Sequence, residues 1–360
     1  MKKTVFYALA LSLLLAWPVR AAEAPPDTSA KAMILIHADS GHVLSEREAD
    51  TPLPMASTTK LMTALAAAEA ADLSAEIEIR PEWTAVEGSS MYLRPGEKYT
   101  LRELLTGLLL ASGNDAALAL AAAVDGSTEA FVERMNRRAA ELGLQNTHFS
   151  NPHGLSAEDH FSCARDLATL MRSVMENECL REILSLRECM IHGQYFQNHN
   201  KLLSGCPGVD GGKTGFTKAA GRCLVSTCVR DGLRLICVTL SDPKDWADHE
   251  ALYDWAYGQF CLWSFPGESD LPSVPVLWGT RTRRRPAPAA PVSLCVEQRT
   301  TVTVEWRVPT LLVSAPALGS EAGEARVYAG NALAARVPLI WVDAAEPVSA
   351  GRPFAGVCPV

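Results

Sequence analysis

The pattern of hydrophobic and polar residues changes once along the chain, near Pro266. Before this point, apolar runs recur at helical spacing and are separated by polar turns and short alternating segments. After it, helical spacing disappears, valines alternate with polar residues, and prolines and glycines recur at short intervals. The pattern predicts a mixed α/β (α+β) domain over residues 32–265, a small all-β domain over residues 270–345, and a tail over residues 346–360.

Within the first domain, the spacing predicts hairpins at both ends and helices between them. Asp231-Gly232 separates two alternating apolar runs, which is a strong signal for a hairpin. Thr100 and Glu103 form a capping-box pattern that opens a helix. The expected helices cover residues 57–71, 100–110, 116–124, 129–142, 163–176 and 246–263, and the expected strands cover residues 32–36, 43–44, 76–79, 92–93, 223–229 and 233–240.

Residues 1–21 have the layout of a secretory signal peptide. Two lysines precede a short apolar run, and Val19 and Ala21 supply small residues at a cleavage site. We expect an exported protein, extracellular, in the cell wall or on the outer face of the cytoplasmic membrane, with residues 22–31 as a flexible leader. An uncleaved N-terminal anchor is the alternative. A lipoprotein is not indicated, because there is no cysteine near the cleavage point. No later segment indicates a clear membrane anchor.

The overall charge is negative. It is −8 at pH 7 for the full chain and becomes −11 without the signal segment, which carries three cations and no acid. An acidic protein of this kind is a poor candidate for binding nucleic acid or an anionic membrane. The basic cluster of Arg281 and Arg283 to Arg285 precedes a proline-rich run, which favours an exposed loop first and a weak surface contact second.

The ten cysteines lie between Cys163 and Cys358 in a pattern that indicates neither a metal site nor a fixed set of disulfides. The Cys-x-x-Cys motif and the paired Cys/His spacing of zinc sites do not occur, so we expect no metal and no cofactor. Cys223, Cys228 and Cys237 fall in apolar runs, where free cysteine is a common core residue. Export permits disulfides, so one or two bridges stay open alongside structural thiols.

Candidate chemistry begins with Ser57 and Lys60, which are three residues apart at the start of an apolar helix. Positions i and i+3 share one face of a helix, which places an amine beside a hydroxyl. A serine is a poor nucleophile until a base takes its proton, and a buried lysine can be that base. Because serine and lysine are common on helix surfaces, the pair carries little weight alone.

Two further polar motifs are candidates for a functional site. Ser112-Gly113-Asn114 interrupts two helices rich in leucine and alanine, and buried polar groups need partners. Lys213-Thr214-Gly215 lies on a strand just before the hairpin, where glycine lets a ligand approach the backbone. His148 and His153 lie in a loop, and for them we favour a bracing role over a catalytic one.

The order Ser57-x-x-Lys60, Ser112-Gly113-Asn114 and Lys213-Thr214-Gly215 resembles the low-molecular-weight penicillin-binding proteins, the serine-type D-alanyl-D-alanine carboxypeptidases of the S11 peptidase type. The resemblance extends over about residues 30–340. It implies a penicillin-binding/β-lactamase-like domain with an antiparallel sheet flanked by helices, plus a small C-terminal all-β domain. It also implies an enzyme that removes the terminal D-alanine from peptidoglycan pentapeptides and is inhibited covalently by β-lactam antibiotics.

The resemblance implies catalytic roles for three residues. Ser57 would attack the carbonyl of the D-Ala-D-Ala bond, and Lys60 would take the Ser57 proton. Ser112 would relay a proton to the leaving amine.

The resemblance also implies five substrate-binding residues. Asn114 would bind the peptide backbone, while Lys213 and Thr214 would bind the terminal carboxylate. The strand that contains Gly215 would pair with an extended peptide, and the N–H of Phe216 would join that of the nucleophile in an oxyanion hole. Lys213 would also help to keep the catalytic lysine neutral.

Two positions depart from the pattern of this family. Phe216 stands where histidine is common, which keeps a backbone donor but removes a side-chain contact. The segment after the hairpin, residues 241–249, lacks the arginine that the family commonly places near the substrate carboxylate. Recognition of that carboxylate would then depend on the Lys-Thr-Gly motif, helped by Lys244 or His249.

Three other functions compete with this one. A class A-like β-lactamase is disfavoured because no Glu-x-x-Leu-Asn base occurs and the second motif is Ser-Gly-Asn instead of Ser-Asp-Asn. A D,D-transpeptidase or endopeptidase shares the same motifs, although the absence of a large N-terminal module favours hydrolysis. A non-catalytic wall-binding protein is least favoured, because every motif residue is intact.

Overall fold

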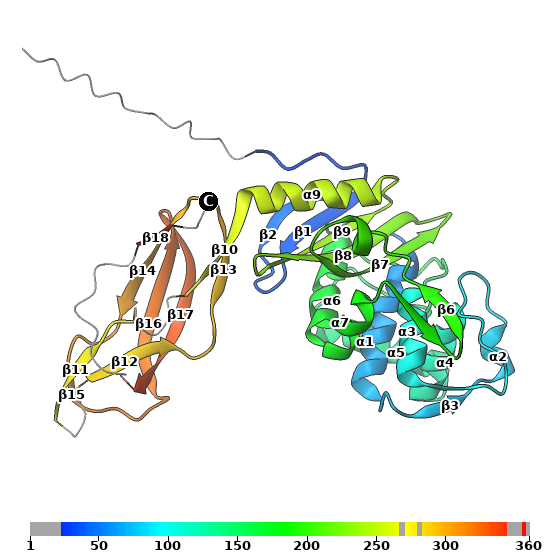
Figure 1. The fold of residues 1–360 in the computed structure, drawn as a ribbon, viewed down its shortest axis with the longest axis horizontal. Helices are drawn as coiled ribbons and strands as arrows, with labels where there is room; N and C mark the ends of the chain where they lie inside the picture. The colour runs from blue at the N-terminus through cyan, green and yellow to red at the C-terminus, as the bar shows by residue number, and fades with distance from the viewer. Residues whose placement is uncertain (1–22, 266–270, 279–282, 344–354, 358–360) are drawn as a thin grey trace, which may run out of the picture.

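The computed structural model describes residues 23–265, 271–278, 283–343 and 355–357. The expected signal peptide over residues 1–21 and most of the expected tail lie outside these ranges. Figure 1 shows a larger body of helices around a sheet and a smaller body of strands, which confirms the predicted fold class. Within the described ranges, no helix combines the length and apolar character that crossing a membrane requires.

A five-stranded antiparallel sheet forms the centre of the larger body. Its strands, in sheet order, are β2 (Val43–Arg47), β1 (Ala32–His37), β9 (Leu233–Leu240), β8 (Gly221–Arg230) and β7 (Val209–Thr217). The predicted hairpin joins β8 to β9: Arg230 pairs with Leu233, and both Asp231 and Gly232 have a positive φ, at 49° and 80°. In the described part of the chain, β7 lies at the edge of the sheet.

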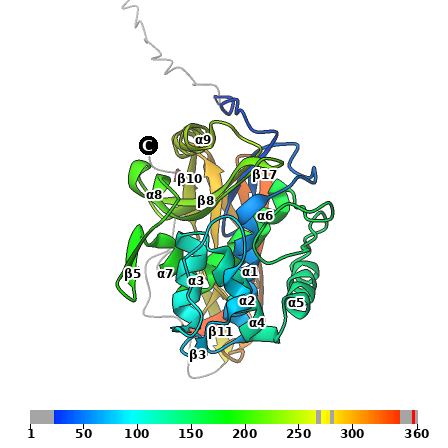
Figure 2. The same ribbon diagram turned by 90° about the vertical axis from the view of Figure 1, so that its right-hand side faces the viewer.

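Helices cover both faces of this sheet, which explains why β1 and β9 are buried along almost their whole length. The helical elements are η1 (Ala56–Thr59), α1 (Lys60–Ala70), α2 (Pro81–Thr84), α3 (Leu101–Leu110), α4 (Asn114–Asp125), α5 (Thr128–Glu141), α6 (Ala164–Glu176), α7 (Glu178–Ser185), α8 (Leu202–Gly205) and α9 (Asp245–Gln259). Figure 2 shows α9 on one side of the sheet and α1, α3 and α6 on the other. Alternate residues of β1 accordingly enter two cores, Ile34 on the α1 side and Leu35 on the α9 side.

Helix signals that are local in the sequence are confirmed. Thr100 caps α3 by accepting from the N–H of Glu103, whose carboxylate accepts from the N–H of Thr100. The first eight residues of α1, from Lys60 to Ala67, are all buried, as the apolar sequence of this helix predicts.

The region between α1 and α3 holds one confirmed strand and one that is wrong. β3 (Glu76–Glu78) pairs with β4 (Lys98–Thr100). Tyr92 instead has a left-handed φ of 60°, and the N–H of Leu93 donates to the carboxylate of Asp115 over 3.1 Å. A buried acid from α4 therefore replaces the strand partner that residues 92–93 lack.

The predicted helix over residues 246–263 is too long. The helix ends at Gln259, and the next five residues form β10 (Phe260–Ser264). This strand pairs with β13 (Ser293–Glu297) along its whole length. A partner from a later part of the chain thus overrides the local helical spacing of four apolar residues.

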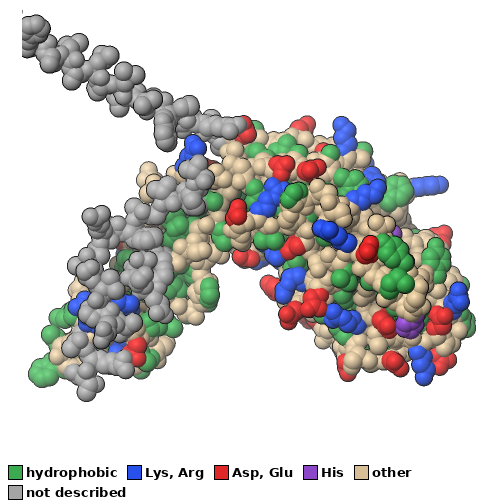
Figure 3. All heavy atoms as spheres, in the orientation of Figure 1, with side chains coloured by type: hydrophobic (Ala, Val, Ile, Leu, Met, Phe, Trp, Pro, Cys, Tyr) green, Lys and Arg blue, Asp and Glu red, His purple; other side chains and the backbone are tan. Residues whose placement is uncertain are grey.

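The smaller body is a seven-stranded sheet with its own core. Its strands, in sheet order, are β15 (Leu312–Ser314), β11 (Val274–Trp278), β12 (Arg283–Pro288), β17 (Ala332–Asp343), β16 (Glu321–Ala329), β14 (Thr301–Arg307) and β18 (Ala355–Val357). Trp263 of β10 packs with Val327 and Trp341 in this core, so β10 belongs to the smaller body. Figure 3 shows an open notch between the two bodies, with acidic and basic side chains interspersed on the visible face of the larger one.

The predicted exposed basic loop is wrong for Arg284 and Arg285, whereas Arg283 is exposed and Arg281 lies outside the described residues. Arg284 and Arg285 lie in β12 and are buried, and Arg284 pairs with Asp343 across 3.1 Å. The sequence could not show this pairing, because Asp343 is 59 residues away.

The segment expected as a flexible leader makes specific contacts from residue 23 on. Ser29 donates through its hydroxyl to Asp242 over 2.5 Å and to Asp248 over 2.9 Å. Ala30 is buried in the core beneath α9. Residues 23–31 therefore pack against the larger body through partners that are more than 200 positions away in the sequence.

Candidate active site

The turn η1 places Ser57 beside Lys60, the first residue of α1. Lys60 Nζ donates to Ser57 Oγ over 3.0 Å, which confirms the contact that the three-residue spacing predicts. Two glycines from other segments pack closely against the backbone of this turn. A methyl group on Gly154 would lie 2.1 Å from the carbonyl oxygen of Ala56, and one on Gly215 would lie 3.0 Å from the nitrogen of Ser57.

Lys60 is fully buried, and three acceptors surround its amine. Besides Ser57, these are Asn114 Oδ1 at 2.7 Å and the carbonyl oxygen of His153 at 2.5 Å. Among the described residues, no carboxylate forms an ion pair with this amine. Burial, followed by repulsion from Lys213, holds the pKa of Lys60 well below its ordinary value, and Asp115 opposes the shift. The amine can therefore reach the neutral form that a base requires.

The Ser-Gly-Asn bend brings Ser112 and Asn114 to the same place. Ser112 has a left-handed φ of 60°, between the end of α3 and the start of α4. Asn114 is buried, and while its oxygen accepts from Lys60, its Nδ2 donates to the carbonyl oxygen of Glu87 over 2.6 Å. The structure therefore places Asn114 as a support for Lys60, behind the pocket wall.

Asp115 is a supporting residue that the sequence reasoning missed. Its carboxylate accepts from the hydroxyl of Ser90 at 2.6 Å and from the N–H groups of Met91 and Leu93 at 3.0 and 3.1 Å. These contacts fix the loop that carries Ser89 to the pocket. The available signal was an acid directly after the motif, in a helix that is otherwise alanine and leucine.

Lys213 lies on β7 and reaches the second serine of the site. Its Nζ donates to Ser112 Oγ over 3.0 Å and to the carbonyl oxygen of Thr214 over 2.8 Å. Burial lowers the pKa of Lys213 to about 7. Lys213 thus contacts the second serine directly and acts on Lys60 through space.

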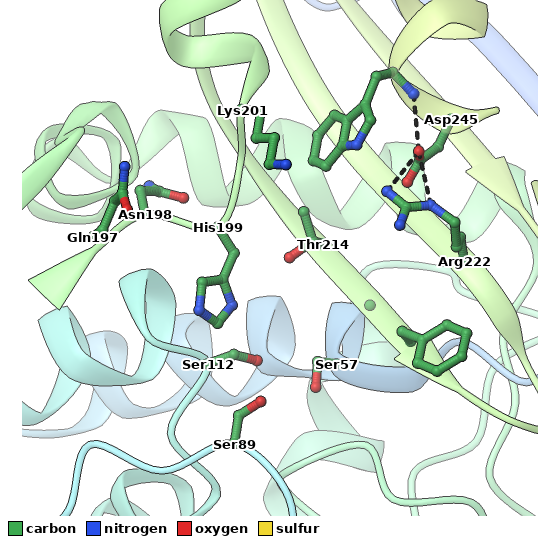
Figure 4. Close-up of a pocket in the computed structure, with 13 residues that line it drawn as sticks. Ser57, Ser89, Ser112, Gln197, Asn198, His199, Lys201, Thr214, Arg222 and Asp245 are labelled. Carbon is green, nitrogen blue, oxygen red and sulfur yellow. Dashed lines mark hydrogen bonds and ion pairs between the residues drawn. The ribbon is translucent and has the colours of Figure 1, made fainter. Parts of the chain in front are cut away.

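These elements enclose a pocket of about 480 Å³. Figure 4 shows Ser57 and Ser112 on one wall and Thr214 on β7 opposite them. A further wall is formed by Gln197, the last residue of the hairpin of β5 (Glu188–Ile191) and β6 (Gln194–Gln197), and by Asn198 and His199, which follow it. The remaining lining residues are Ser89, Lys201, Gly215, Phe216, Arg222, Asp245 and Trp246.

The expected help from His249 is wrong, and Arg222 occupies the pocket instead. His249 is fully buried, with its two ring nitrogens within 2.7 Å of Ser226 Oγ and 3.0 Å of Thr239 Oγ1. Lys244, the other expected helper, is not among the residues that line the pocket. Arg222 pairs in register with Phe216, so their side chains share one face of the hairpin. This register could not be read from the sequence.

The loop histidines brace the structure, as expected. His148 Nδ1 lies 2.6 Å from the carbonyl oxygen of Asp159. His153 contributes its backbone carbonyl to Lys60, and burial lowers the pKa of its side chain to about 4. His160, which the sequence reasoning did not single out, lies 2.7 Å from Thr59 Oγ1, directly beside the nucleophile turn.

The site thus contains two serine hydroxyls, each of which accepts a hydrogen bond from a buried lysine. A model of the D-alanyl-D-alanine carboxypeptidase family, peptidase S11, matches residues 19–244. The chain belongs to this family. All eight predicted site residues of this family member converge on the same pocket or directly behind its wall.

Curated relatives agree with the family assignment. D-alanyl-D-alanine carboxypeptidase DacF of Bacillus subtilis is 38% identical over 244 residues, which cover 64% of this chain and 63% of DacF. DacB2 of Mycobacterium tuberculosis is 36% identical over 244 residues, which cover 64% of this chain and 84% of DacB2. The match therefore spans less than two thirds of the length of DacF.

Solved structures share the fold. Penicillin-binding protein 5 from Haemophilus influenzae superposes with a TM-score of 0.77 at 25% identity, covering 89% of this chain and 98% of that chain. A D-alanyl-D-alanine carboxypeptidase from Mycobacterium tuberculosis H37Rv has a TM-score of 0.64 at 35% identity, covering 66% and 95%. The first likeness extends over both bodies, and the second covers about two thirds of this chain.

Proposed function

We propose that this chain is a serine-type D-Ala-D-Ala carboxypeptidase that removes the terminal D-alanine from peptidoglycan pentapeptides through an acyl-enzyme on Ser57. The observation that carries the proposal is the 3.0 Å contact between Ser57 Oγ and the fully buried amine of Lys60. A lysine held this way is a base next to a nucleophile, which is the arrangement that acyl transfer requires. Family membership supports the same reaction.

Acylation begins at Ser57. Neutral Lys60 takes the hydroxyl proton as Ser57 Oγ attacks the carbonyl carbon of the penultimate D-alanine. The backbone N–H groups of Ser57 and Phe216 stabilise the oxyanion that develops, and one such donor typically contributes about 3 kcal/mol. The close packing of Gly215, the residue before Phe216, against the nitrogen of Ser57 supports this assignment.

Departure of D-alanine needs a proton at its nitrogen. Ser112 is positioned to relay that proton, because its hydroxyl lies in the pocket and accepts from Lys213 over 3.0 Å. The relay returns Lys60 to the neutral form. Lys60 can then deprotonate the water that hydrolyses the acyl-enzyme.

The substrate peptide binds along β7. This strand lies at the sheet edge in the described part of the chain, so its outward N–H and C=O groups can pair with an extended peptide. Thr214 and Gly215 line the pocket from this strand. Asn114 acts through Lys60, because its oxygen accepts from that amine.

Arg222 binds the terminal carboxylate, together with Thr214 and the positive potential of Lys213. Nε and Nη2 of Arg222 face Asp245 Oδ1 at 2.9 and 2.8 Å. Among the described residues, Nη1 has no hydrogen-bond partner, and the side chain is 40% exposed in the pocket. Arginine offers five N–H donors in a fork that matches a carboxylate, so Nη1 can bind the substrate while Asp245 holds the group in place.

The proposal is tested by measuring D-alanine release from a D-Ala-D-Ala-terminated pentapeptide, with penicillin as inhibitor. Ser57→Ala should abolish both D-alanine release and the mass increase that penicillin causes. Ser204→Ala, an exposed serine of α8 outside the pocket, should retain both. Penicillin labelling that persists in Ser57→Ala would contradict the assignment of the nucleophile.

The same assay separates the competing reactions. Rapid catalytic turnover of penicillin would identify a β-lactamase. A cross-linked product with an added amine, and no free acid, would identify a D,D-transpeptidase. Absence of both labelling and product would leave a wall-binding protein.

We also propose that the protein is exported and acts on peptidoglycan in the wall or at the outer face of the cytoplasmic membrane. The signal-like composition of residues 1–21 and the membership in a family that acts on peptidoglycan support this location. Detection of the protein outside the cytoplasm, with its N-terminus near residue 22, would test it.

A further inference from the structure

Two cysteines meet beneath the start of β7, away from the pocket. Cys206 follows α8, and Cys228 lies in β8, where it pairs in register with Val209. Both are buried, 4% and 0% exposed, in the core beneath α9. Both thiols contact the same small group of neighbours, formed by Pro207 and Arg230, and both are free in this structure.

The surroundings of the pair favour one thiolate. Arg230 donates through Nη2 to Cys206 Sγ over 3.6 Å, while Cys228 Sγ donates to the carbonyl oxygen of Pro207 over 3.5 Å. The interaction with Cys228, together with Arg230, lowers the pKa of Cys206 to about 7, although burial opposes the shift. The interaction with Cys206 and burial raise the pKa of Cys228.

This combination distinguishes Cys206 from the other free thiols in the described part of the chain. Burial raises the pKa of each of the others outside the pair, as expected for inert core cysteines. The structure also holds Cys261 in a disulfide, so this chain is not uniformly reduced.

We propose that Cys206 and Cys228 are joined as a disulfide when the chain folds in the presence of an external disulfide, as in an oxidising exported compartment. The Cys206 thiolate attacks the external disulfide, forming a mixed disulfide and releasing one thiolate. Cys228 then loses its proton and attacks the Cys206 sulfur, which releases the second thiolate. The chain thus loses two protons and two electrons, and the external disulfide becomes two thiols.

The bond would close a loop that contains all of β7, with the Lys-Thr-Gly motif inside it. It would also tie α8 to the sheet. The segment before α8 is already held to β7 by Asn200, whose Nδ2 donates to the carbonyl oxygen of Gly211 over 3.2 Å. Because the pair lies in the core beneath α9 and neither cysteine lines the pocket, we expect the bond to stabilise the edge strand without changing the chemistry at Ser57.

The decisive experiment is a peptide map of the full-length protein, secreted into an oxidising compartment and denatured with iodoacetamide present. We expect a linked peptide pair that contains Cys206 and Cys228, loss of the alkyl label from both, and full labelling after dithiothreitol. Cys223, a buried β8 thiol that is not hydrogen-bonded to a second thiol, should be labelled in both samples. Labelling of both Cys206 and Cys228 without reductant, or linkage of either one to another cysteine, would overturn the proposal.

A second measurement uses the reduced protein and glutathione disulfide. Wild type should gain the 206–228 linkage, and its melting temperature should rise by several degrees relative to the reduced form. Cys223→Ser should show the same gain, whereas Cys206→Ser should not form the linkage. Penicillin labelling of wild type should proceed at the same rate in both redox states, so this inference can fail while the proposed function holds, and the reverse. If Cys206→Ser does not fold, the peptide map of wild type still decides.

Discussion

The ammonium group of Lys213 lies 3.0 Å from the hydroxyl oxygen of Ser112 and donates a hydrogen bond to it. Lys60 makes the corresponding contact with Ser57, also at 3.0 Å. Two lysine–serine pairs therefore face one pocket, and repulsion between the two amines is the second cause of the lowered pKa of Lys60. In the mechanism that we propose, Lys60 serves as the base, and the charge of Lys213 helps to keep that base neutral.

Removing the charge of Lys213 should move the pH dependence of acylation. In Lys213→Ala the pKa of Lys60 rises, so a larger fraction of Lys60 is protonated and inactive at any given pH. The acid limb of the rate of penicillin labelling should therefore move up by about one pH unit. Because burial lowers the pKa of Lys213 itself to about 7, the effect should be largest below pH 7, where Lys213 is charged.

Lys213→Arg is the control for this experiment, because it keeps a positive charge on β7. Its acid limb should stay near that of wild type even if the rate falls. An unchanged limb in Lys213→Ala would show that burial alone sets the pKa of Lys60.

Arg222→Gln should weaken the binding of substrates that carry a free terminal carboxylate. Loss of a hydrogen bond between charged groups predicts a fall in kcat/KM of about tenfold or more, mainly through KM. For a peptide whose terminal carboxylate is replaced by an amide, kcat/KM should fall much less. Steady-state kinetics with the two peptides make the comparison.

Arg230→Gln is a matched control for Arg222→Gln. Arg230 lies at the other end of β8, and it likewise pairs with an aspartate of α9, Asp254, and lies over an aromatic ring, that of Tyr257. It does not line the pocket. If Arg222→Gln lowers kcat/KM equally for the free acid and the amide, Arg222 does not bind the terminal carboxylate.

Gly154→Ala should disable the nucleophile turn. Its φ is +90°, and the added methyl group would meet the carbonyl oxygen of Ala56 at 2.1 Å, so Ala56 and Ser57 must move. A displacement of about 1 Å at a reacting group can reduce the rate by about a hundredfold. The rate of penicillin labelling and the melting temperature should both fall.

Gly143→Ala separates the effect of backbone strain at a positive φ from the effect of the steric clash with Ala56. Gly143 also has a left-handed φ, at +73°, but no atom lies within 4 Å of the added methyl group. We expect a stability loss of about 1 kcal/mol and normal labelling. If both variants label normally, the contact with Ala56 is not what positions the nucleophile.

Stability should fall in mild acid because of His160. Its Nδ1 accepts from the N–H of Ser150 over 3.1 Å, so the neutral ring carries its proton on Nε2, toward Thr59. Burial lowers the pKa of His160 from 6.5 to about 4. A group whose pKa is lower in the folded state contributes stability that is complete above pH 6.5 and is lost as the pH falls toward 4, here roughly 3 kcal/mol at most.

Urea unfolding between pH 4 and pH 7 tests this prediction. His160→Gln should reduce the slope of the unfolding free energy with pH, while His153, whose pKa is also lowered to about 4, keeps part of it. His148→Gln is the control for the substitution itself, because its half-exposed ring contacts a backbone carbonyl at the surface. A wild-type unfolding free energy that is flat over this range would contradict the argument.

Local patterns predicted what depends on neighbours in the chain. The contact between Ser57 and Lys60 follows from a spacing of three residues, and the cap of α3 follows from Thr100 and Glu103. The resemblance then brought Ser112 and Lys213, which are distant in sequence, to the same pocket. The structure adds that these two side chains touch.

Sequence patterns failed to predict the structure where it depends on a partner from a distant part of the chain. Arg222 enters the pocket because of its register with Phe216, and the strand at Phe260–Ser264 forms because a later strand pairs with it. Arg284 is buried because Asp343 offers a partner 59 residues later. Neither helical spacing nor strand alternation can identify these partners, because both patterns relate only residues of the same helix or strand.

The position of β7 at the edge of its sheet has a consequence for substrate choice. Pairing along a strand edge reads the main chain of a peptide, which is the same for every residue type, whereas side chains point above and below it. Discrimination must then come from the two ends of the bound segment, the reacting carbonyl and the terminal acid. If the chain acts as we propose, this geometry predicts similar rates on stem peptides that differ in their third residue.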